Sequence, residues 1–258
     1  MKKSISPSLL LILVIGLSSF IFLQDTKPTL YIIGDSTVRN ANTNGLWGWG
    51  SLIENYLDTT KIVVSNQAMA GRSTRTFLKE GRWDKVLSTL KKGDFVMIQF
   101  GHNEGSKPDT TKAGYRGVLN GTGEETKELI WPDGKPETVH TYGWYLRKFV
   151  RDAQAKGAEV YICSMIPRND FKEGKVLRAD QSYGKWAKEV AAQEHAFFID
   201  LNTITADKYD MLGADKVKNF FPKEHTHTNK DGANINAQSV ITGLQQLNNA
   251  GLAKFILK

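Results

Sequence analysis

The sequence predicts an α/β protein whose core is a five-stranded parallel sheet with helices on both faces. Two observations lead to this fold class. Five short apolar segments rich in β-branched and aromatic residues recur along the chain, and segments with helical spacing separate them. Parallel strands joined by helices are buried on both faces, which accounts for near-continuous apolar runs such as 30–33 and 95–98.

Each predicted strand is a run of apolar residues that ends at a polar or glycine-containing turn. The predicted strands are residues 29–33, 61–65, 94–100, 158–163 and 196–200. Because crossover connections between parallel strands are right-handed, only a few topologies remain. We predict the strand order 2-1-3-4-5 of a three-layer, flavodoxin-like fold.

Helices are predicted where apolar residues recur every three or four positions. They cover residues 51–57, 73–78, 83–90, 142–156, 181–195 and 231–247, and a further segment, 202–212, follows the fifth strand. Ser73 suits an N-cap, and Gly93 and Gly157 suit helix ends. Residues 105–140 show no clear period and hold several glycines and prolines, so we expect an irregular, functional loop there.

The first 25 residues differ from the rest of the chain. Lys2 and Lys3 precede an apolar run over 9–23, which is typical of an export signal and short for a membrane span. No clear cleavage site follows, so an uncleaved N-terminal anchor remains an alternative. We predict a leader over 1–25 and one domain over 28–258, in a secreted or periplasmic protein.

Charge and cysteine content exclude several functions. The chain has 34 Lys and Arg against 27 Asp and Glu, a formal charge of +7, but the basic residues are scattered. Nucleic-acid binding is therefore not expected. The positive charge serves either solubility or attraction of an acidic polymer such as a polyuronate. Cys163 is the only cysteine, so neither an internal disulfide nor a multi-cysteine metal site can form.

Gly34-Asp35-Ser36 follows the first predicted strand directly. Functional groups in open α/β sheets gather at the carboxyl ends of strands, so our hypothesis is that Ser36 is a nucleophile. The same residues also suit a turn or a helix cap. The hypothesis therefore requires that the chain also supply a base, an acid and oxyanion donors.

The best candidates for base and acid lie just before the last predicted helix. Of the five histidines, His225 and His227 fall there, with Glu224 beside them. In a helical turn positions i and i+3 face each other, so Glu224 can meet His227. The chain order Ser, Glu, His also occurs in α/β hydrolases. Such a short string is more often a solvated loop or chance metal-ligand spacing.

Candidate oxyanion donors follow the second and third predicted strands. Gly71 lies in a loop of small residues, and Asn103 follows strand three in Gly101-His102-Asn103. The backbone N–H groups of Ser36 and Gly71 and the Asn103 amide are suitable donors. Turn formation is the alternative for both the glycine and the asparagine. Successive strand ends that each carry one required group favour catalysis.

Four sequence blocks together resemble the SGNH, or GDSL-type, hydrolase superfamily. They are Gly34-Asp35-Ser36, the loop from Asn66 to Gly71-Arg72-Ser73, Gly101-His102-Asn103, and the segment from Glu224 to His227. Longer strings resemble the rhamnogalacturonan acetylesterase branch of this superfamily. They are Gly34-Asp35-Ser36-Thr37, Phe100-Gly101-His102-Asn103 and His225-Thr226-His227-Thr228. The resemblance spans roughly residues 30–240.

The resemblance implies ester hydrolysis without a metal or cofactor. Ser36 would be the nucleophile and His227 the base. The acid of the family falls at Glu224, where aspartate is usual. The Ser36 and Gly71 N–H groups and the Asn103 side chain would form the oxyanion hole.

The resemblance also implies a substrate, an acetylated pectic polysaccharide or oligosaccharide. Four side chains are predicted to grip sugar rings or carboxylates: Arg116, Trp131, Tyr142 and Arg168. Glu104 stands where the family commonly has aspartate, and we assign it no catalytic role. We expect a monomer that touches a membrane only through the leader, if the leader is uncleaved.

Three other functions remain open at the level of sequence. A lipid or thioester hydrolase of the same superfamily would need a large apolar groove, and the sequence shows no lipid-binding stripe. A non-catalytic carbohydrate-binding protein would not need Ser36, Asn103 and His227 together. A metal-dependent hydrolase would use Glu224, His225 and His227, and full activity after chelation would exclude it.

Overall fold

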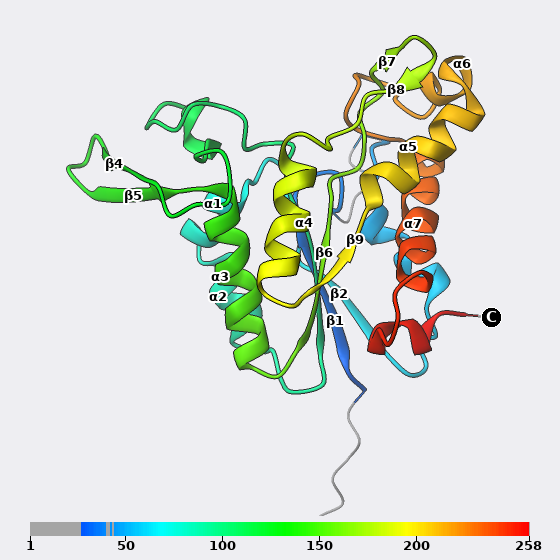
Figure 1. Ribbon diagram of the computed structural model, residues 1–258, viewed down its shortest axis with the longest axis horizontal. Helices are drawn as coiled ribbons and strands as arrows, with labels where there is room; N and C mark the ends of the chain where they lie inside the picture. Colours follow the sequence, from blue (N-terminus) through cyan, green and yellow to red (C-terminus); the bar gives the residue numbers. More distant parts are fainter. Residues whose placement is uncertain (1–26, 40–41, 43, 258) are drawn as a thin grey trace, which may run out of the picture.

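A computed structural model describes residues 27–39, 42 and 44–257 of the chain. Its centre is one five-stranded sheet with the order β2-β1-β3-β6-β9 and only parallel pairs (Figure 1). The strands are β1 (Thr29–Gly34), β2 (Val63–Asn66), β3 (Phe95–Gln99), β6 (Glu159–Cys163) and β9 (Phe197–Ile199). These are the five predicted strands in the predicted 2-1-3-4-5 order, so the fold class is confirmed.

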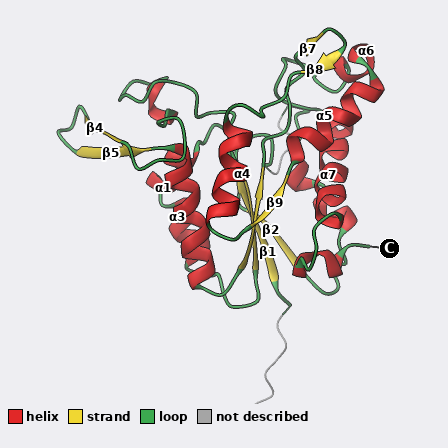
Figure 2. Cartoon of the chain, in the orientation of Figure 1, coloured by secondary structure: helices red, strands yellow, loops and turns green. Residues whose placement is uncertain are grey.

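Helices cover both faces of this sheet (Figure 2). One face carries α1 (Thr74–Lys79), α2 (Arg82–Leu87), α3 (Tyr142–Ala155) and α4 (Tyr183–Gln193). The other carries α5 (Leu201–Leu212), α7 (Lys230–Gln245) and the 3₁₀ helix Gly251–Phe255. Successive residues of β1 enter opposite layers: Leu30 and Ile32 pack in one core, and Tyr31 and Ile33 in the other. This is the period of two that an extended strand imposes.

The helix predicted over residues 51–57 has a different form. The structure contains two short 3₁₀ helices there, Trp49–Ser51 and Ile53–Tyr56. The backbone at Gly50 lies so close to Val38 that a Cβ atom would stand 2.5 Å from the Val38 carbonyl oxygen. Such a close approach, within a short connection, favours tight 3₁₀ turns over a regular α-helix.

The stretch over 105–140 is not irregular throughout. It contains the 3₁₀ helix η3 (Gly114–Arg116) and an antiparallel hairpin of β4 (Thr126–Ile130) and β5 (Pro136–His140), which projects at the left of Figure 1. Pro-Asp-Gly in the turn, with Gly134 at φ +82°, is a local hairpin signal. Most hairpin residues are exposed or half-exposed and polar, so apolar periodicity is weak there.

Two smaller elements lie near the end of α5. A short hairpin of β7 (Phe171–Lys172) and β8 (Lys175–Val176) contacts this helix, and α6 (Ala214–Lys218) follows it. Val176 donates its N–H to the carboxylate of Asp210 on α5 at 2.8 Å. This contact fixes the polar segment after β6 against the helical layer.

The predicted leader over 1–25 lies outside the described residues. The described chain begins at Lys27, just before β1. In the ranges that the structure describes, no helix combines the length and apolarity needed to cross a membrane. Cys163 is fully buried at the end of β6, where burial raises the pKa of its thiol.

Candidate active site

The turn that carries Ser36 follows β1 and is held by buried hydrogen bonds. Asp35 Oδ1 accepts from the N–H and the hydroxyl of Thr37, at 2.8 and 2.7 Å. The Gln99 side chain, at the end of β3, donates to the Thr37 hydroxyl at 2.8 Å. A Cβ atom at Gly34 would stand 2.5 Å from the Gln99 carbonyl oxygen, so this position needs glycine. The packing presents Ser36 from a rigid turn.

His227 reaches Ser36 from the loop between α6 and α7. Its Nε2 atom lies 2.7 Å from Ser36 Oγ, across 191 residues of sequence. The loop is docked by Trp47, whose N–H donates to the Thr228 carbonyl oxygen at 2.8 Å. The Thr228 hydroxyl returns a hydrogen bond to the Trp47 carbonyl oxygen at 3.1 Å. The imidazole is therefore within proton-transfer reach of the hydroxyl.

Glu224 occupies the other side of the imidazole. Its Oε1 atom lies 2.5 Å from His227 Nδ1 and accepts the His227 N–H at 2.7 Å. Its Oε2 atom accepts the Thr226 N–H at 2.8 Å. Partial burial works to raise the pKa of Glu224, but these hydrogen bonds outweigh it and lower the pKa below its usual value. Glu224 therefore places a negative charge against the imidazole.

The loop that holds Gly71 lies between β2 and α1. Gly71 has φ +72°, a left-handed conformation that favours glycine. Arg72 pins the loop, because its Nε donates to the Glu80 carboxylate at 2.9 Å and its Nη1 to the Ala70 carbonyl oxygen at 3.0 Å. Ser73 caps α1, as predicted.

Asn103 joins the loop after β3 to the Gly71 loop. Its Nδ2 atom donates to the Arg72 carbonyl oxygen at 3.1 Å. Arg116 Nη1, from η3, donates to Asn103 Oδ1 at 2.8 Å. Because the guanidinium engages the amide oxygen, the Asn103 amide is held in one orientation. The structure thus places Arg116 on a proposed oxyanion donor, and its predicted sugar contact stays a prediction.

Two buried titratable groups lie behind these loops. Glu104 accepts the Thr74 N–H and the Asn103 N–H, each at 2.9 Å. Burial and the charge of Asp35 raise the pKa of Glu104 to about 8, and the two N–H donors offset only part of this shift. Burial also lowers the pKa of His102 to about 4, and neither of its ring nitrogens has a partner in the described structure. Both groups are thus held mainly neutral at pH 7.

The metal-dependent alternative requires Glu224, His225 and His227 to bind one ion together, but His225 has a different partner from the other two. Glu224 is paired with His227, whereas His225 Nδ1 lies 2.7 Å from Asp170 Oδ1. Across the described residues, no three His, Cys, Asp or Glu side chains are arranged to hold a metal ion. The structure therefore gives this alternative no donor set.

The other predicted sugar contacts lie in three different environments. Tyr142 is only 1% exposed and donates its hydroxyl to the Phe100 carbonyl oxygen at 3.1 Å, so it belongs to the core and its predicted sugar contact is wrong. Arg168 lies beside His102, with Nη2 3.4 Å from the His102 carbonyl oxygen. Trp131 lines a cavity between the β4–β5 hairpin and the helical layer.

A hydroxyl, an imidazole and a carboxylate in hydrogen-bonded sequence, with two donor-bearing loops nearby, suit acyl transfer. In agreement, the GDSL-like Lipase/Acylhydrolase family model matches residues 32–235. The chain belongs to the GDSL-like lipase/acylhydrolase family. It is a carboxylic ester hydrolase, and the superfamily resemblance drawn from the four blocks is confirmed.

Similar proteins extend this result. Rhamnogalacturonan acetylesterase of Emericella nidulans is 34% identical over 213 residues, which cover 83% of each chain. Rhamnogalacturonan acetylesterase RhgT of Bacillus subtilis is 28% identical and covers 86% of this chain and 91% of its own. The crystal structure of Bacillus subtilis YxiM superposes with a TM-score of 0.70 at 24% identity, over 88% of this chain and 58% of that one. This last likeness shows a shared fold. The two named relatives agree with the branch that the motifs indicated.

Sequence reasoning missed the contacts that hold the candidate site together. These contacts are Arg116 on Asn103, Trp47 on Thr228, and Glu104 on Thr74, and each joins two different loops or elements. None has a local pattern that predicts its partner. Only the position of Glu104 directly after Asn103 offered a signal, and that signal did not reveal its burial.

Proposed function

We propose that this protein is a carbohydrate acetylesterase that removes O-acetyl groups from a plant cell-wall polysaccharide, most specifically pectic rhamnogalacturonan. The names of its relatives support this substrate. The observation that carries the chemistry is the continuous contact of Ser36 Oγ with His227 Nε2 at 2.7 Å and of His227 Nδ1 with Glu224 at 2.5 Å. A base aligned on the hydroxyl and oriented by a carboxylate is what a serine nucleophile requires.

In the proposed mechanism, Ser36 Oγ attacks the acetyl carbonyl carbon while His227 Nε2 takes the hydroxyl proton. Glu224 holds the Nδ1 proton and stabilises the imidazolium that forms. Collapse of the tetrahedral intermediate breaks the ester bond, and His227 gives its proton to the departing sugar oxygen. Water, deprotonated by His227, then attacks the acetyl-serine, which releases acetate and restores the Ser36 hydroxyl.

The oxyanion of each tetrahedral intermediate needs hydrogen-bond donors beside Ser36. We assign this role to the Ser36 and Gly71 N–H groups and the Asn103 side chain. The contact of Asn103 with the Arg72 carbonyl oxygen supports the assignment, because it brings the two donor loops together. Arg116 then acts as a positioning residue for the Asn103 amide.

The proposal includes export to the cell exterior or periplasm, which the basic and apolar start of the sequence supports. It includes action as a monomer without a cofactor. Among the alternatives, a non-catalytic binding protein would have no use for the aligned Ser36–His227–Glu224 contacts. A lipid hydrolase would need an apolar groove at Ser36, and Ser36 is not among the residues that line the apolar cavity beside Trp131.

The test is acetate release from a panel of acetylated polysaccharides, with the wild-type protein beside Ser36→Ala. We expect release from acetylated rhamnogalacturonan and a loss on the order of 10⁶-fold in Ser36→Ala. Residual turnover near wild type in this variant would contradict the mechanism. Preference for acetylated xylan over pectin would overturn the substrate and leave the chemistry. Activity that disappears on chelation and returns with metal would revive the metal-dependent alternative.

A further inference from the structure

A cavity of about 670 Å³ lies between the β4–β5 hairpin and the helices α1 and α3. Its size falls within the usual range for small-ligand sites. Neither Ser36, Asn103 nor His227 lines it, so it is separate from the candidate active site. The hairpin that closes one side is the element that sequence periodicity did not predict.

Aromatic rings form much of the cavity wall. Trp131 and Tyr115 meet edge to face with centroids 5.6 Å apart, and His140 stacks on Trp144 at 3.7 Å. Tyr145 contacts both members of the stacked pair. Flat apolar ring faces with a polar rim suit the C–H faces of pyranose sugars, which bury apolar area while their hydroxyls stay near polar groups.

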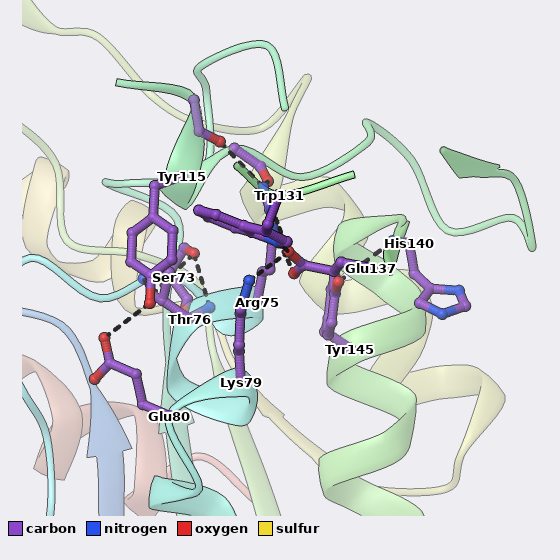
Figure 3. A network of polar contacts seen from close by, with 12 residues as sticks. Ser73, Arg75, Thr76, Lys79, Glu80, Tyr115, Trp131, Glu137, His140 and Tyr145 are labelled. Atoms are coloured by element: carbon purple, nitrogen blue, oxygen red, sulfur yellow. Dashed lines mark hydrogen bonds and ion pairs between the residues drawn. The ribbon is translucent and has the colours of Figure 1, made fainter. Parts of the chain in front are cut away.

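An ion-pair network around the buried Arg75 holds this wall together (Figure 3). Arg75 on α1 is 1% exposed and binds both oxygens of Glu137 on β5, at 2.8 and 2.9 Å. Lys79 and the Trp131 indole N–H bind the same carboxylate, each at 2.6 Å. Lys79 Nζ also lies 3.5 Å from the Trp131 ring centroid. These contacts tie the hairpin to α1 and fix the indole before a ligand arrives.

Two elements link the cavity to the candidate active site. In η3, Tyr115 lines the cavity while the next residue, Arg116, binds Asn103. Helix α1 follows the Gly71 loop and carries Arg75 and Lys79 into the cavity wall. The cavity and the candidate active site are therefore built in part on the same two elements.

We propose that this cavity is a second carbohydrate-binding site, which holds a distal segment of the polysaccharide whose acetyl group reacts at Ser36. The proposal rests on the proposed function. The lining has three cationic side chains, Arg75, Lys79 and Lys135, each paired with one of the two carboxylates of Asp133 and Glu137, which leaves one net positive charge. This balance favours a segment that carries uronate carboxylates over a neutral one.

Direct binding tests the site without turnover. In the Ser36→Ala background, calorimetry with deacetylated rhamnogalacturonan oligosaccharides should show binding that Trp131→Ala weakens about five- to tenfold. Ile130→Ala is the matched control, because Ile130 is exposed on the same hairpin and does not line the cavity. Trp131→Phe, which keeps a ring, should retain most of the affinity. If Trp131→Ala fails to fold, Trp144→Ala takes its place and should show the same weakening.

Equal weakening by Ile130→Ala and Trp131→Ala would overturn the site, as would no weakening by either tryptophan variant. Neutral xylan oligosaccharides that bind as tightly as the uronate-bearing ones would overturn the assigned ligand. Binding of a medium-chain fatty acid in place of any oligosaccharide would also overturn it. Because binding is measured on an inactive variant, absence of esterase activity in the wild type would count against the proposed function alone.

A kinetic comparison provides a second readout. For an enzyme with a distal sugar site, Trp131→Ala should raise KM for acetylated polysaccharide more than it lowers kcat. The ratio of kcat/KM on the polysaccharide to kcat/KM on p-nitrophenyl acetate should fall about five- to tenfold. Ile130→Ala should leave this ratio at the wild-type value. An unchanged ratio in Trp131→Ala would contradict the proposal.

Discussion

Two glutamates beside the proposed catalytic groups are in opposite electrostatic states. Glu224 lies three residues before His227, is part-exposed, and has a lowered pKa because donors surround its charge. Glu104 directly follows Asn103, is fully buried, and has a pKa raised to about 8. Both stand where the family commonly has aspartate. Their environments, not their residue type, decide which one carries charge at neutral pH.

The comparison separates two tasks that a carboxylate can perform in one site. Glu224 supplies a charge to the imidazole and is exposed enough for that charge to persist. Glu104 joins two loops through the Thr74 and Asn103 N–H groups, and needs only acceptor oxygens for this task. Replacing each carboxylate by its amide should therefore give effects of different size and kind.

Glu224→Gln should cause the largest loss of turnover among substitutions around the two carboxylates. The glutamine NH₂ group can turn toward Nδ1 and favour the wrong imidazole tautomer, so we expect kcat to fall about 10³- to 10⁴-fold. Acetate release under saturating substrate measures this loss. Glu224→Asp, which restores the usual residue of the family, should recover a large part of it. Near wild-type turnover in Glu224→Gln would remove the orienting role from this carboxylate.

Asn103→Ala tests the proposed oxyanion donor, whose backbone N–H donates to Glu104. Loss of one oxyanion donor should lower kcat about 10²- to 10³-fold while KM changes little. Arg116→Lys serves as a comparison, because it keeps the charge beside Asn103 but loses the planar guanidinium. A rise in KM alone after Asn103→Ala would indicate a substrate contact instead of an oxyanion donor.

Glu104→Gln should have a smaller effect on turnover. The amide oxygen can still accept one N–H, but its NH₂ group would face the other donor, so one of the two loops loses its contact. We expect kcat to fall about tenfold through displacement of Asn103. The double variant Glu104→Gln/Asn103→Ala should then be no slower than Asn103→Ala by itself, because both changes act through the same amide. If the losses of kcat in the two single variants add up in the double variant, Glu104 does not act through the Asn103 amide.

The smallest expected effect is on the pH dependence of folding stability, to which Glu104 and Glu224 contribute with opposite sign. Because the pKa of Glu104 is raised from its usual 4.5 to about 8 by folding, the folded state binds more protons than the unfolded state between these values. Its contribution to stability is thus greatest below pH 4.5 and falls as pH rises toward 8. Glu224 contributes in the opposite sense, since its lowered pKa favours the folded state until pH falls through that pKa.

The melting temperature, measured from pH 5 to 8, should therefore fall by a few degrees more in the wild type than in Glu104→Gln. Ser36→Ala, which leaves Glu104 in place, is the control and should decline as the wild type does. If Glu104→Gln and the wild type decline in parallel, Glu104 does not titrate in this range.

The β4–β5 hairpin and the burial of Tyr142 are two features that the sequence does not predict. Pro-Asp-Gly is a local turn signal within the segment predicted to be irregular, but the strands that flank it are largely polar and exposed, so apolar periodicity does not mark them. Tyr142 is the first residue of α3, and the sequence predicts that it contacts a sugar. Packing of α3 instead buries it against the sheet. Burial of a single side chain depends on which elements meet, and local pattern does not specify that.

The sequence by itself determined the strand order, the Ser36 turn and the blocks that hold Gly71, Asn103 and His227, because strand formers and the turns that end them are encoded locally. Tertiary structure decided that His227 meets Ser36, that Glu104 is neutral and that Trp131 faces a cavity. Each of these depends on contacts between segments far apart in the chain and on the burial those contacts create. Burial sets pKa and access, and no run of neighbouring residues fixes it.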